Sequence, residues 1–458
     1  MIAAASAGSA SVAVTLAWGV FAFGAVYPWA YWTLALLASL TGVIGVLQGR
    51  ESLAPYRRVG AGLAAIAAAI AVQLAPLPNA VLQRVSPATL AVVKETDVAF
   101  GTAPGAAHAV SVAPAATATA LVLFGAFGLL LLGLLRTSTT AGARRLAVVV
   151  AVLGTMVALV GIVQKPLYDG KVYGFWEPLM PGSAFGPFIN TNQFAGWMLM
   201  ALPLTLGLLW EGVASGMRRV RPDWRARILW LSSPAANRTV LLAAAAAVMA
   251  VALVLTMSRS GIAAAAVATA ITTWYAMRRL DGSRRRALAL AAGLTMLAGI
   301  PSWVGVQAIA ARFSEGDIAT LNDRVPIWLD TAAIVDDFWL TGSGLNTYGV
   351  TTLFYQERVQ GVHLREAHND YLQLAAEGGL LVGLPIAASL AAFVGAVRRR
   401  FRDGPHGGDW IRMGASMGLL AIALQSAVDF SLQMPGNAAM FVVLCAVALH
   451  RSDERAAA

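Results

Sequence analysis

Long apolar segments recur along the whole chain, separated by shorter polar stretches. A helix needs about 20 apolar residues to cross a hydrocarbon core of ~30 Å. The segments are rich in Ala, Leu, Val and Gly and do not alternate with polar residues, which favours spanning helices over barrel strands. The pattern predicts spans at 10–26, 30–47, 59–76, 117–135, 146–164, 193–212, 239–257, 262–277, 287–306, 379–397, 413–428 and 438–450.

Composition agrees with this pattern. The chain has 458 residues, of which 58% are hydrophobic and 12% charged, whereas soluble domains carry about 25% charged residues. We therefore predict an all-α polytopic membrane protein with about twelve transmembrane helices. The lone cysteine, Cys445, lies in the last apolar segment, so no intrachain disulfide is possible.

The distribution of basic residues predicts the topology. Of the 33 Lys and Arg residues, 24 lie in the C-terminal tail and in the loops that follow spans 2, 4, 6, 8 and 10. The positive-inside rule then places both termini in the cytoplasm of a bacterium and the other loops outside the cytoplasmic membrane. The net charge of +10 is thereby explained without a nucleic-acid partner.

Three of the predicted outer loops are longer than a connection requires. Loop 77–116 has no distinctive chemistry, and loop 165–192 is dense in aromatic residues, Gly and Pro. The large loop 307–378 contains ten acidic residues and four Arg. Its stretch 323–339 is amphipathic and predicts a short helix at the membrane surface.

Arg259 interrupts an apolar stretch, TMSRSGIAAAA, that leaves no room for a long loop. A guanidinium near lipid costs about 2.5–3.5 kcal/mol even on insertion scales, so such a residue is a functional candidate by default. The alternative is a tight turn from which the side chain reaches the headgroups.

Arg324 lies in LNDRVPIW, at the start of the predicted surface helix. Its guanidinium presents five donors in a rigid fork that suits phosphate oxygens. The alternative is a salt bridge with Asp323 or with another carboxylate of this acidic loop.

His368 lies in REAHNDYLQLAAEGGLLVG. Asn369 or Asp370 can cap the helix that follows, which places the imidazole at a helix N-terminus. The helix dipole and any nearby Arg disfavour imidazolium, and a general base must be neutral. The alternative is a loop histidine bound to the backbone; His363 and Arg365 share this ambiguity.

Other polar residues are weaker candidates. Glu315 and Asp317 have an acid-x-acid spacing that can hold Mg²⁺ or Mn²⁺, but in so acidic a loop the pattern is not distinctive, and we predict no metal and no cofactor. Asp429, Asn190 and Asn192 are second-tier candidates, because capping or helix-end hydration explains them equally well. The histidines expected at the surface are His108, His406 and His450.

Several of these motifs together resemble the O-antigen ligase/polymerase family of membrane glycosyltransferases, which share a Wzy_C-type core. The resemblance covers about 190–435 and depends on the order and spacing of weak motifs. They are FGPFINTNQFAGWMLMALPL (185–204), SRSG (258–261), NDRVPIW (322–328), DDFWLTGSGLNTY (336–348), AHNDYLQLAAEGGLLVG (367–383) and SAVDF (426–430).

The resemblance implies a GT-C-like fold and an inverting, metal-independent transfer of a glycan from undecaprenyl-diphosphate to an acceptor hydroxyl, on the periplasmic face of the inner membrane. The acceptor is lipid A–core in ligases and another glycan in polymerases. Arg259 and Arg324 would hold the diphosphate, and His368 would act on the acceptor hydroxyl. The supporting candidates are Asn369, Arg312, Asn190, Asn192 and Asp429.

The aromatic residues of the second outer loop would either stack on sugar faces or form a membrane-interface belt. They are Tyr173, Phe175, Trp176, Phe185 and Phe188. An apolar groove between helices would suffice for the polyprenyl tail.

Alternatives remain open within and beyond this class. O-antigen ligation is the leading hypothesis; a polysaccharide polymerase or a protein O-oligosaccharyltransferase would share the core. A lipid-linked glycan transporter is the competing class, and it would carry charged or broken helices at mid-membrane in both halves. We divide the chain into N-terminal helices (1–190), the core (190–435) and a last helix with a cytoplasmic tail (436–458).

Overall fold

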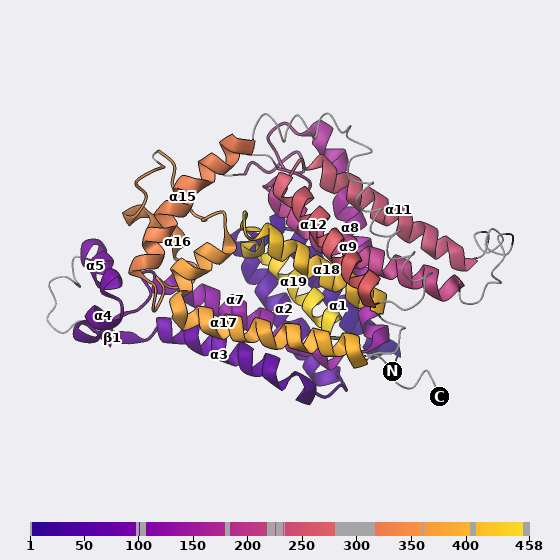
Figure 1. The fold of residues 1–458 in the computed structure, drawn as a ribbon, viewed down its shortest axis with the longest axis horizontal. Helices are drawn as coiled ribbons and strands as arrows, with labels where there is room; N and C mark the ends of the chain where they lie inside the picture. Colours follow the sequence, from indigo (N-terminus) through magenta and orange to yellow (C-terminus); the bar gives the residue numbers. More distant parts are fainter. Residues whose placement is uncertain are drawn as a thin grey trace.

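The computed structural model describes residues 2–97, 100, 107–178, 184–217, 225, 232, 234–279, 317–359, 361–403 and 409–451. Within these residues the chain forms a bundle of long helices, with shorter elements at one end (Figure 1). The long helices are α1 (Ile2–Phe21), α2 (Pro28–Gln48), α3 (Arg57–Gln73), α7 (Pro114–Arg136), α8 (Thr140–Gln164), α9 (Thr191–Met217), α11 (Pro234–Leu255), α12 (Arg259–Arg279), α15 (Asp317–Asp337), α17 (Asp370–Asp403), α18 (Asp409–Gln425) and α19 (Pro435–Leu449).

Eleven of the twelve predicted spans overlap one of these helices, and the other, 287–306, lies outside the described residues. In the described part of the chain, six helices are long and apolar enough to cross a membrane: Pro28–Gln48, Pro114–Arg136, Thr140–Leu167, Thr191–Gly216, Ala236–Leu255 and Asp370–Arg402. The all-α membrane class is therefore confirmed. The only strands among the described residues are two three-residue strands that form one sheet.

Small residues allow the helices to pack closely. A Cβ atom at Gly42 of α2 would lie 2.6 Å from the Leu129 carbonyl of α7, and one at Gly133 would lie 2.3 Å from the Gly42 carbonyl. A Cβ atom at Gly414 of α18 would similarly lie 2.3 Å from the Pro203 carbonyl of α9. These contacts hold α2 against α7 and α9 against α18 at the centre of the bundle.

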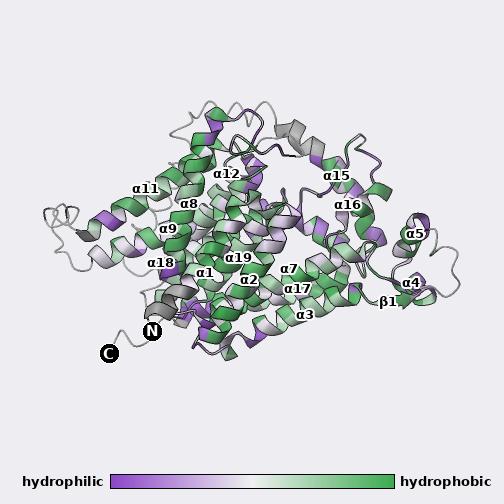
Figure 2. Ribbon diagram, turned by 180° about the vertical axis from the view of Figure 1, so that it is seen from behind, coloured by the Kyte–Doolittle hydropathy of each residue, from purple (hydrophilic) through white to green (hydrophobic). Residues whose placement is uncertain are grey.

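At one end of the bundle lie loops that the distribution of Lys and Arg residues predicts to be cytoplasmic. Arg451 donates its backbone N–H to the Ser138 carbonyl (3.0 Å), and the Tyr56 hydroxyl donates to the Leu449 carbonyl (3.0 Å). The elements α4, α5, α15 and α16 lie toward the opposite end (Figure 1). The bundle helices are mainly hydrophobic in Figure 2, with hydrophilic residues concentrated toward the ends.

His450 at this end was expected at the surface, and that prediction is wrong. It is only 1% exposed, because the end of α19 docks against α18 and the Arg412 guanidinium donates to the His450 carbonyl (2.9 Å). His108 is partly exposed, and His406 lies outside the described residues.

The opposite end gathers the loops predicted to lie outside. Loop 77–116 forms β1 (Pro76–Pro78), α4 (Asn79–Val85), α5 (Pro87–Thr96) and β2 (Ala107–Ala109), with β1 and β2 antiparallel. Its apolar residues form a small core of their own: Leu82, Leu90, Val93, Phe100 and Val110. Ser111 donates its N–H to the Gln73 carbonyl (2.9 Å), and the Thr117 hydroxyl donates to the Leu345 carbonyl (2.9 Å).

The large outer loop includes α15, α16 (Tyr348–Thr351) and η4 (Thr352–Phe354). The prediction of a helix at 323–339 is confirmed, since α15 covers Asp317–Asp337. Shorter one-turn elements elsewhere are η1 (Phe23–Ala25), η2 (Ala54–Tyr56), η3 (Lys165–Leu167) and η5 (Ser431–Gln433).

Helix α17 is broken at Gly379, which adopts φ 53° and ψ −158°. A Cβ atom there would lie 2.5 Å from the Gly342 nitrogen, so the loop after α15 can pass only over glycine. At the break, carbonyl groups of this loop replace the helical acceptors. The backbone N–H of Leu380 donates to the Trp339 carbonyl (2.8 Å), and that of Leu381 donates to the Leu340 carbonyl (2.9 Å). The first two turns of α17 thus belong to the outer end, and the remainder is the span.

Candidate active site

Arg259 begins α12 directly after a three-residue turn. Met257 in this turn has φ 55°, and the Ser258 hydroxyl accepts the Gly261 N–H (3.2 Å), which caps the helix. A Cβ atom at Gly261 would lie 2.8 Å from that of Ala195, so glycine brings this turn close to α9. The tight turn considered from the sequence is present, with Arg259 partly buried at the outer end.

Asn192 ties this turn to the rest of the site. The Ser258 hydroxyl donates to its Oδ1 (2.7 Å), and Gln425 Nε2 and the Ser431 hydroxyl donate to its backbone carbonyl (3.1 Å each). Asn190 in turn accepts the Asn192 N–H through its own Oδ1 (2.8 Å). Both Asn residues therefore act on backbone and hydroxyl groups that fix the turn bearing Arg259.

Arg324 points from α15 toward the segment between α18 and α19. One guanidinium nitrogen lies 3.7 Å from the Asp429 carboxylate, and another donates to the Val428 carbonyl. The side chain of Arg324 remains 21% exposed, whereas that of Asp429 is fully buried. The acidic partner of Arg324 is thus a distant residue in sequence; the Asp323 side chain lies outside the described residues.

Asp429 connects the two arginine-bearing segments. It accepts the Phe430 N–H (2.9 Å) and the hydroxyl of Ser260 (3.4 Å), the residue after Arg259. Burial raises the pKa of Asp429, while these hydrogen bonds and the Arg324 charge oppose that shift. The sequence placed Asp429 in the second tier, and its central position results from tertiary contacts alone.

His368 precedes the cap of α17. Asn369, not Asp370, is the capping side chain, and its Oδ1 accepts the N–H groups of Tyr371 (3.1 Å) and Leu372 (3.0 Å). His368 itself has φ 52°, in the left-handed region that L-residues rarely adopt. Its ring meets the Phe430 ring edge-on, with centroids 4.9 Å apart.

The His368 ring is held neutral. Burial, and then the Arg324 charge, lower the pKa of His368 to about 4. The expected neutrality is therefore present, although burial contributes more than the neighbouring charge. Its buried Nδ1 has no hydrogen-bond partner among the described residues. Buried polar atoms normally have a hydrogen-bond partner, so an unpaired buried nitrogen requires a functional or structural explanation.

Residues 428–430 therefore bring the three predicted catalytic segments together, through Ser260, Arg324 and His368. Sequence reasoning quoted SRSG but gave its two serines no role. His363, by contrast, is exposed and contacts the Gly349 carbonyl.

Two further predictions lie outside the described part of the chain. Arg312 and Glu315 are not described, nor is the side chain of Asp317. Within the described residues no group of three or more His, Cys, Asp and Glu is arranged to hold a metal ion. The Glu315/Asp317 hypothesis is thus untested.

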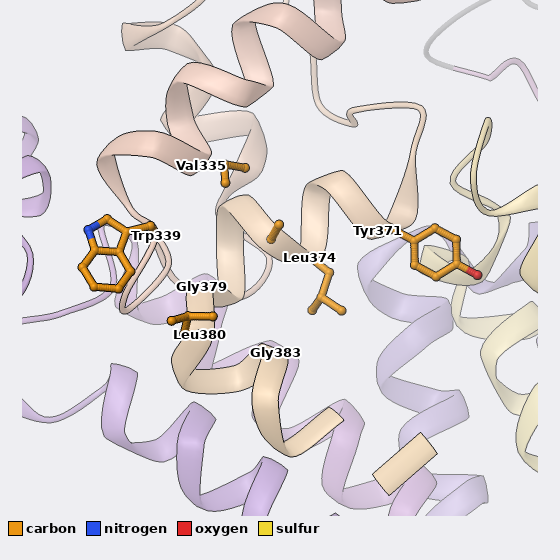
Figure 3. A pocket seen from close by; sticks show the side chains of 8 residues that line it. Val335, Trp339, Tyr371, Leu374, Gly379, Leu380 and Gly383 are labelled. Carbon is orange, nitrogen blue, oxygen red and sulfur yellow. The ribbon is translucent and has the colours of Figure 1, made fainter. Parts of the chain in front are cut away.

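An apolar groove of about 380 Å³ lies beside the start of α17. Val335 and Trp339, in and just after α15, line one side, and Tyr371 and Leu374 of α17 line the other (Figure 3). At its base the groove reaches the break at Gly379. It therefore runs from Tyr371, three residues after His368, to Gly383 in the part of α17 beyond the break.

The family model of O-antigen ligases (Wzy_C) matches residues 244–387. This range contains Arg259, Arg324 and His368, together with the four motifs from SRSG to AHNDYLQLAAEGGLLVG. The resemblance inferred from the motifs is thereby confirmed, while 185–204 and 426–430 lie outside the matched range. No curated protein matches the chain.

Proposed function

We propose that the chain is a membrane glycosyltransferase that transfers a glycan from undecaprenyl-diphosphate to an acceptor hydroxyl, with O-antigen ligation to lipid A–core as its reaction. The observation that carries the proposal is the buried, unpaired Nδ1 of His368 beside Arg324, within a region that matches the O-antigen ligases. The match supports a ligase- or polymerase-type membrane function, and the acceptor is our inference.

In the proposed reaction the acceptor oxygen attacks the anomeric carbon as the bond from that carbon to the diphosphate oxygen breaks. The hydroxyl proton passes to His368 Nδ1, the configuration inverts, and undecaprenyl-diphosphate leaves. Negative charge grows on the leaving diphosphate, and preorganised guanidinium groups lower the barrier by meeting it there. Arg259 and Arg324 have this role in the proposal.

The ion pair between Arg324 and Asp429 supports a charge exchange on donor binding. A diphosphate carries more negative charge than one carboxylate and offers better geometry to the guanidinium fork. Its arrival also offsets the Arg324 charge that lowers the pKa of His368. The base is therefore weak in the free protein and becomes stronger once the donor is bound.

The apolar groove supports a lipid-linked donor. Trp339 (56% exposed) and Leu380 (45%) continue its apolar surface onto the span of α17, where Leu384 is 61% exposed. A polyprenyl chain lying there would enter sideways from the outer leaflet, with its diphosphate toward the start of α17. We place the site on the periplasmic face of the inner membrane and both termini in the cytoplasm.

The reaction is tested with the full-length protein in nanodiscs, supplied with an undecaprenyl-diphosphate-linked glycan and lipid A–core. We expect glycan to appear on lipid A–core. Glycan elongation on the lipid carrier would identify a polymerase, and glycan attached to protein would identify an oligosaccharyltransferase. Movement of the donor across a vesicle membrane without transfer to any acceptor would identify a transporter and overturn the proposal.

The orientation is tested by labelling single cysteines in intact cells with a membrane-impermeant reagent. Cysteine at Asn346 should react and cysteine at Ser52 should not, while the native Cys445 is buried and stays silent. The reverse pattern would overturn the topology.

A further inference from the structure

A cluster of aromatic side chains lies at the outer end, apart from the three candidate catalytic residues. The outer aromatic cluster comprises Phe23, Tyr27, Trp29, Tyr173, Phe175 and Trp176. Phe23 is buried at its centre and contacts Tyr27, Trp29, Tyr173 and Trp176. The rings come from two chain segments, the α1–α2 connection and the loop after α8.

Two parallel ring pairs belong to this cluster. Tyr27 and Trp29 have centroids 6.3 Å apart with planes inclined by 5°, and Tyr173 and Phe175 have centroids 6.0 Å apart with planes inclined by 19°. Trp29 is 46% exposed and Phe175 is 71% exposed. The cluster thus presents ring surface to the outside on both of its segments.

Both segments are held in costly backbone conformations. Phe23, Ala25 and Tyr173 have φ of 59°, 56° and 58°, and none of them is glycine. The left-handed conformation is unfavourable for an L-residue with a side chain, and such outliers concentrate at ligand-binding and catalytic sites. Two of these residues lie in the connection between α1 and α2, and the third lies in the loop after α8.

The polar atoms of these rings are used inside the cluster. The Tyr173 hydroxyl donates to the Phe21 carbonyl (2.8 Å), and the Trp176 indole N–H donates to the Tyr27 hydroxyl (2.9 Å). Aromatic residues of a membrane-interface belt keep their polar ends at the headgroups. In this cluster the polar ends of Tyr173, Trp176 and Tyr27 are instead used in hydrogen bonds within the protein, while Trp29 and Phe175 are the exposed rings.

Charged side chains border the cluster. Lys171 and Glu177 flank the loop and pair at 3.6 Å, and both are well exposed. Such groups can bind sugar hydroxyls, while the C–H faces of sugar rings pack against the electron-rich faces of aromatic rings. Ring surface with a charged border is the combination that a saccharide requires.

The cluster is joined to the candidate active site. A Cβ atom at Gly24 would lie 2.9 Å from the Phe188 ring, and Phe188 contacts Phe194 of α9. Lys165, at the end of α8, donates to the Leu255 carbonyl just before the turn that bears Arg259. Packed side chains therefore link the aromatic cluster to the elements that carry the candidate active site.

We propose that the outer aromatic cluster is a saccharide-binding platform that holds the glycan of a substrate away from its reacting end. The proposal depends on the proposed glycan transfer. Trp29 and Phe175 supply the stacking surfaces, and Lys171 and Glu177 bind hydroxyl groups. The platform acts on binding and not on the chemical step, so it distinguishes long glycans from single sugars.

The test uses the full-length protein in nanodiscs with Trp29→Ala, Phe175→Ala and the double variant. With a donor that carries a long glycan, we expect KM to rise about tenfold in the double variant, because burial of two ring faces is lost. The turnover number should stay within about twofold. With a donor that carries one sugar, KM should not change.

Trp32→Ala is the matched control. Trp32 is on the same helix and has a similar exposure of 44%, but its only ring contact among the described residues is with Tyr31. If the cluster is an interface belt, Trp29→Ala and Trp32→Ala will behave alike and glycan length will have no effect, which would overturn the platform. Phe175→Trp should retain the wild-type KM.

Two further arms identify the source of the glycan and separate this proposal from the proposed function. KM is measured for the donor and for the acceptor in turn. The substrate whose KM rises in the double variant is the one whose glycan binds the platform. Binding of free glycan, released from the lipid carrier by mild acid, is followed by saturation-transfer NMR. This binding should weaken in the double variant even if no transfer reaction is found. A wild-type protein that transfers glycan, with variants that match it in every arm, would overturn the platform alone.

Discussion

The two ends of the bundle each contain a buried histidine beside an arginine, and the pairs differ in what surrounds them. Burial and the neighbouring arginine lower the pKa of both His368 and His450 to about 4. His450 Nδ1 lies 2.7 Å from the Val447 carbonyl, and Arg412 is fully buried. His368 Nδ1 has no partner among the described residues, and Arg324 is partly exposed.

This comparison teaches that a lowered pKa does not by itself identify a functional histidine. Arg412 donates to the Arg400 and His450 carbonyls and thereby clasps α18 to the end of α19. The Arg324 pair has a strained backbone, an unused nitrogen and a cation that substrate can reach. Only the second arrangement leaves atoms available for chemistry, and the predictions below test that distinction.

The largest effect is expected from His368→Ala. Removing a general base commonly costs about 10²–10⁴ in rate, and donor binding should be retained because the arginines remain. Single-turnover transfer and donor binding are measured side by side in nanodiscs. His363→Ala, which removes an exposed histidine five residues away, is the control. Near-normal transfer by the His368 variant would leave catalysis to charge and positioning alone.

Arg324→Ala and Arg259→Ala should each lower the rate about 10²–10³-fold, because they remove charge that meets the leaving diphosphate. Donor affinity should fall as well, since the charge also binds the ground state. Lysine at either position should restore the rate and the donor affinity only partly, because its ammonium group lacks the bidentate fork of arginine. Arg365→Ala is the control, since Arg365 is exposed in the same loop. Unchanged donor affinity in both alanine variants would contradict the diphosphate site.

Arg412→Ala should instead affect stability. It leaves a cavity and removes the hydrogen bonds that clasp α18 to α19, which costs about 2–4 kcal/mol of unfolding free energy. The protein that remains folded should transfer glycan at the normal rate. Thermal unfolding is compared with transfer per folded molecule, and a normal melting temperature would contradict the clasp.

Much of the fold could be predicted, because a spanning helix is recognised in the sequence by the length and apolarity of its segment. Eleven predicted spans overlap helices, and the helix predicted at 323–339 overlaps α15, which begins earlier, at Asp317, and ends at Asp337. The break at Gly379 was not predicted, since it depends on the carbonyls of Trp339 and Leu340, forty residues away. The position of His450 was mispredicted for the same reason, because burial is a tertiary property.

The candidate site could be proposed from the sequence as a set of residues, but its arrangement could not be predicted. Arg259 was singled out by its apolar surroundings, and His368 by the cap that follows it. Nothing local in SAVDF reveals that Asp429 contacts both Ser260 and Arg324. Likewise, the sequence of loop 165–192 shows aromatic residues but not the left-handed turn at Tyr173 or its partner turn at Phe23.

The pH dependence of transfer should distinguish His368 from His450, because only the pKa of His368 should respond to the donor. Because His368 must be neutral to accept a proton, activity is lost as pH falls through its pKa. That pKa is about 4 in the free protein and rises when bound diphosphate offsets Arg324. The acid limb of kcat should therefore lie at higher pH than that of kcat/KM. Titration of His450 by NMR should not respond to donor, and coincident limbs would contradict the charge exchange.

The smallest effect is expected from chelation. In the proposed reaction Arg259 and Arg324 supply the positive charge that a metal ion would otherwise bring to the diphosphate, so transfer should proceed at the same rate in EDTA. The measurement compares initial rates in EDTA, in Mg²⁺ and in Mn²⁺ with the full-length protein. If EDTA abolishes transfer and either cation restores it, the two-arginine model fails. The acid-x-acid pair Glu315 and Asp317 then becomes the leading metal site, and Glu315→Gln should weaken the cation response while leaving the His368 pH limb in place.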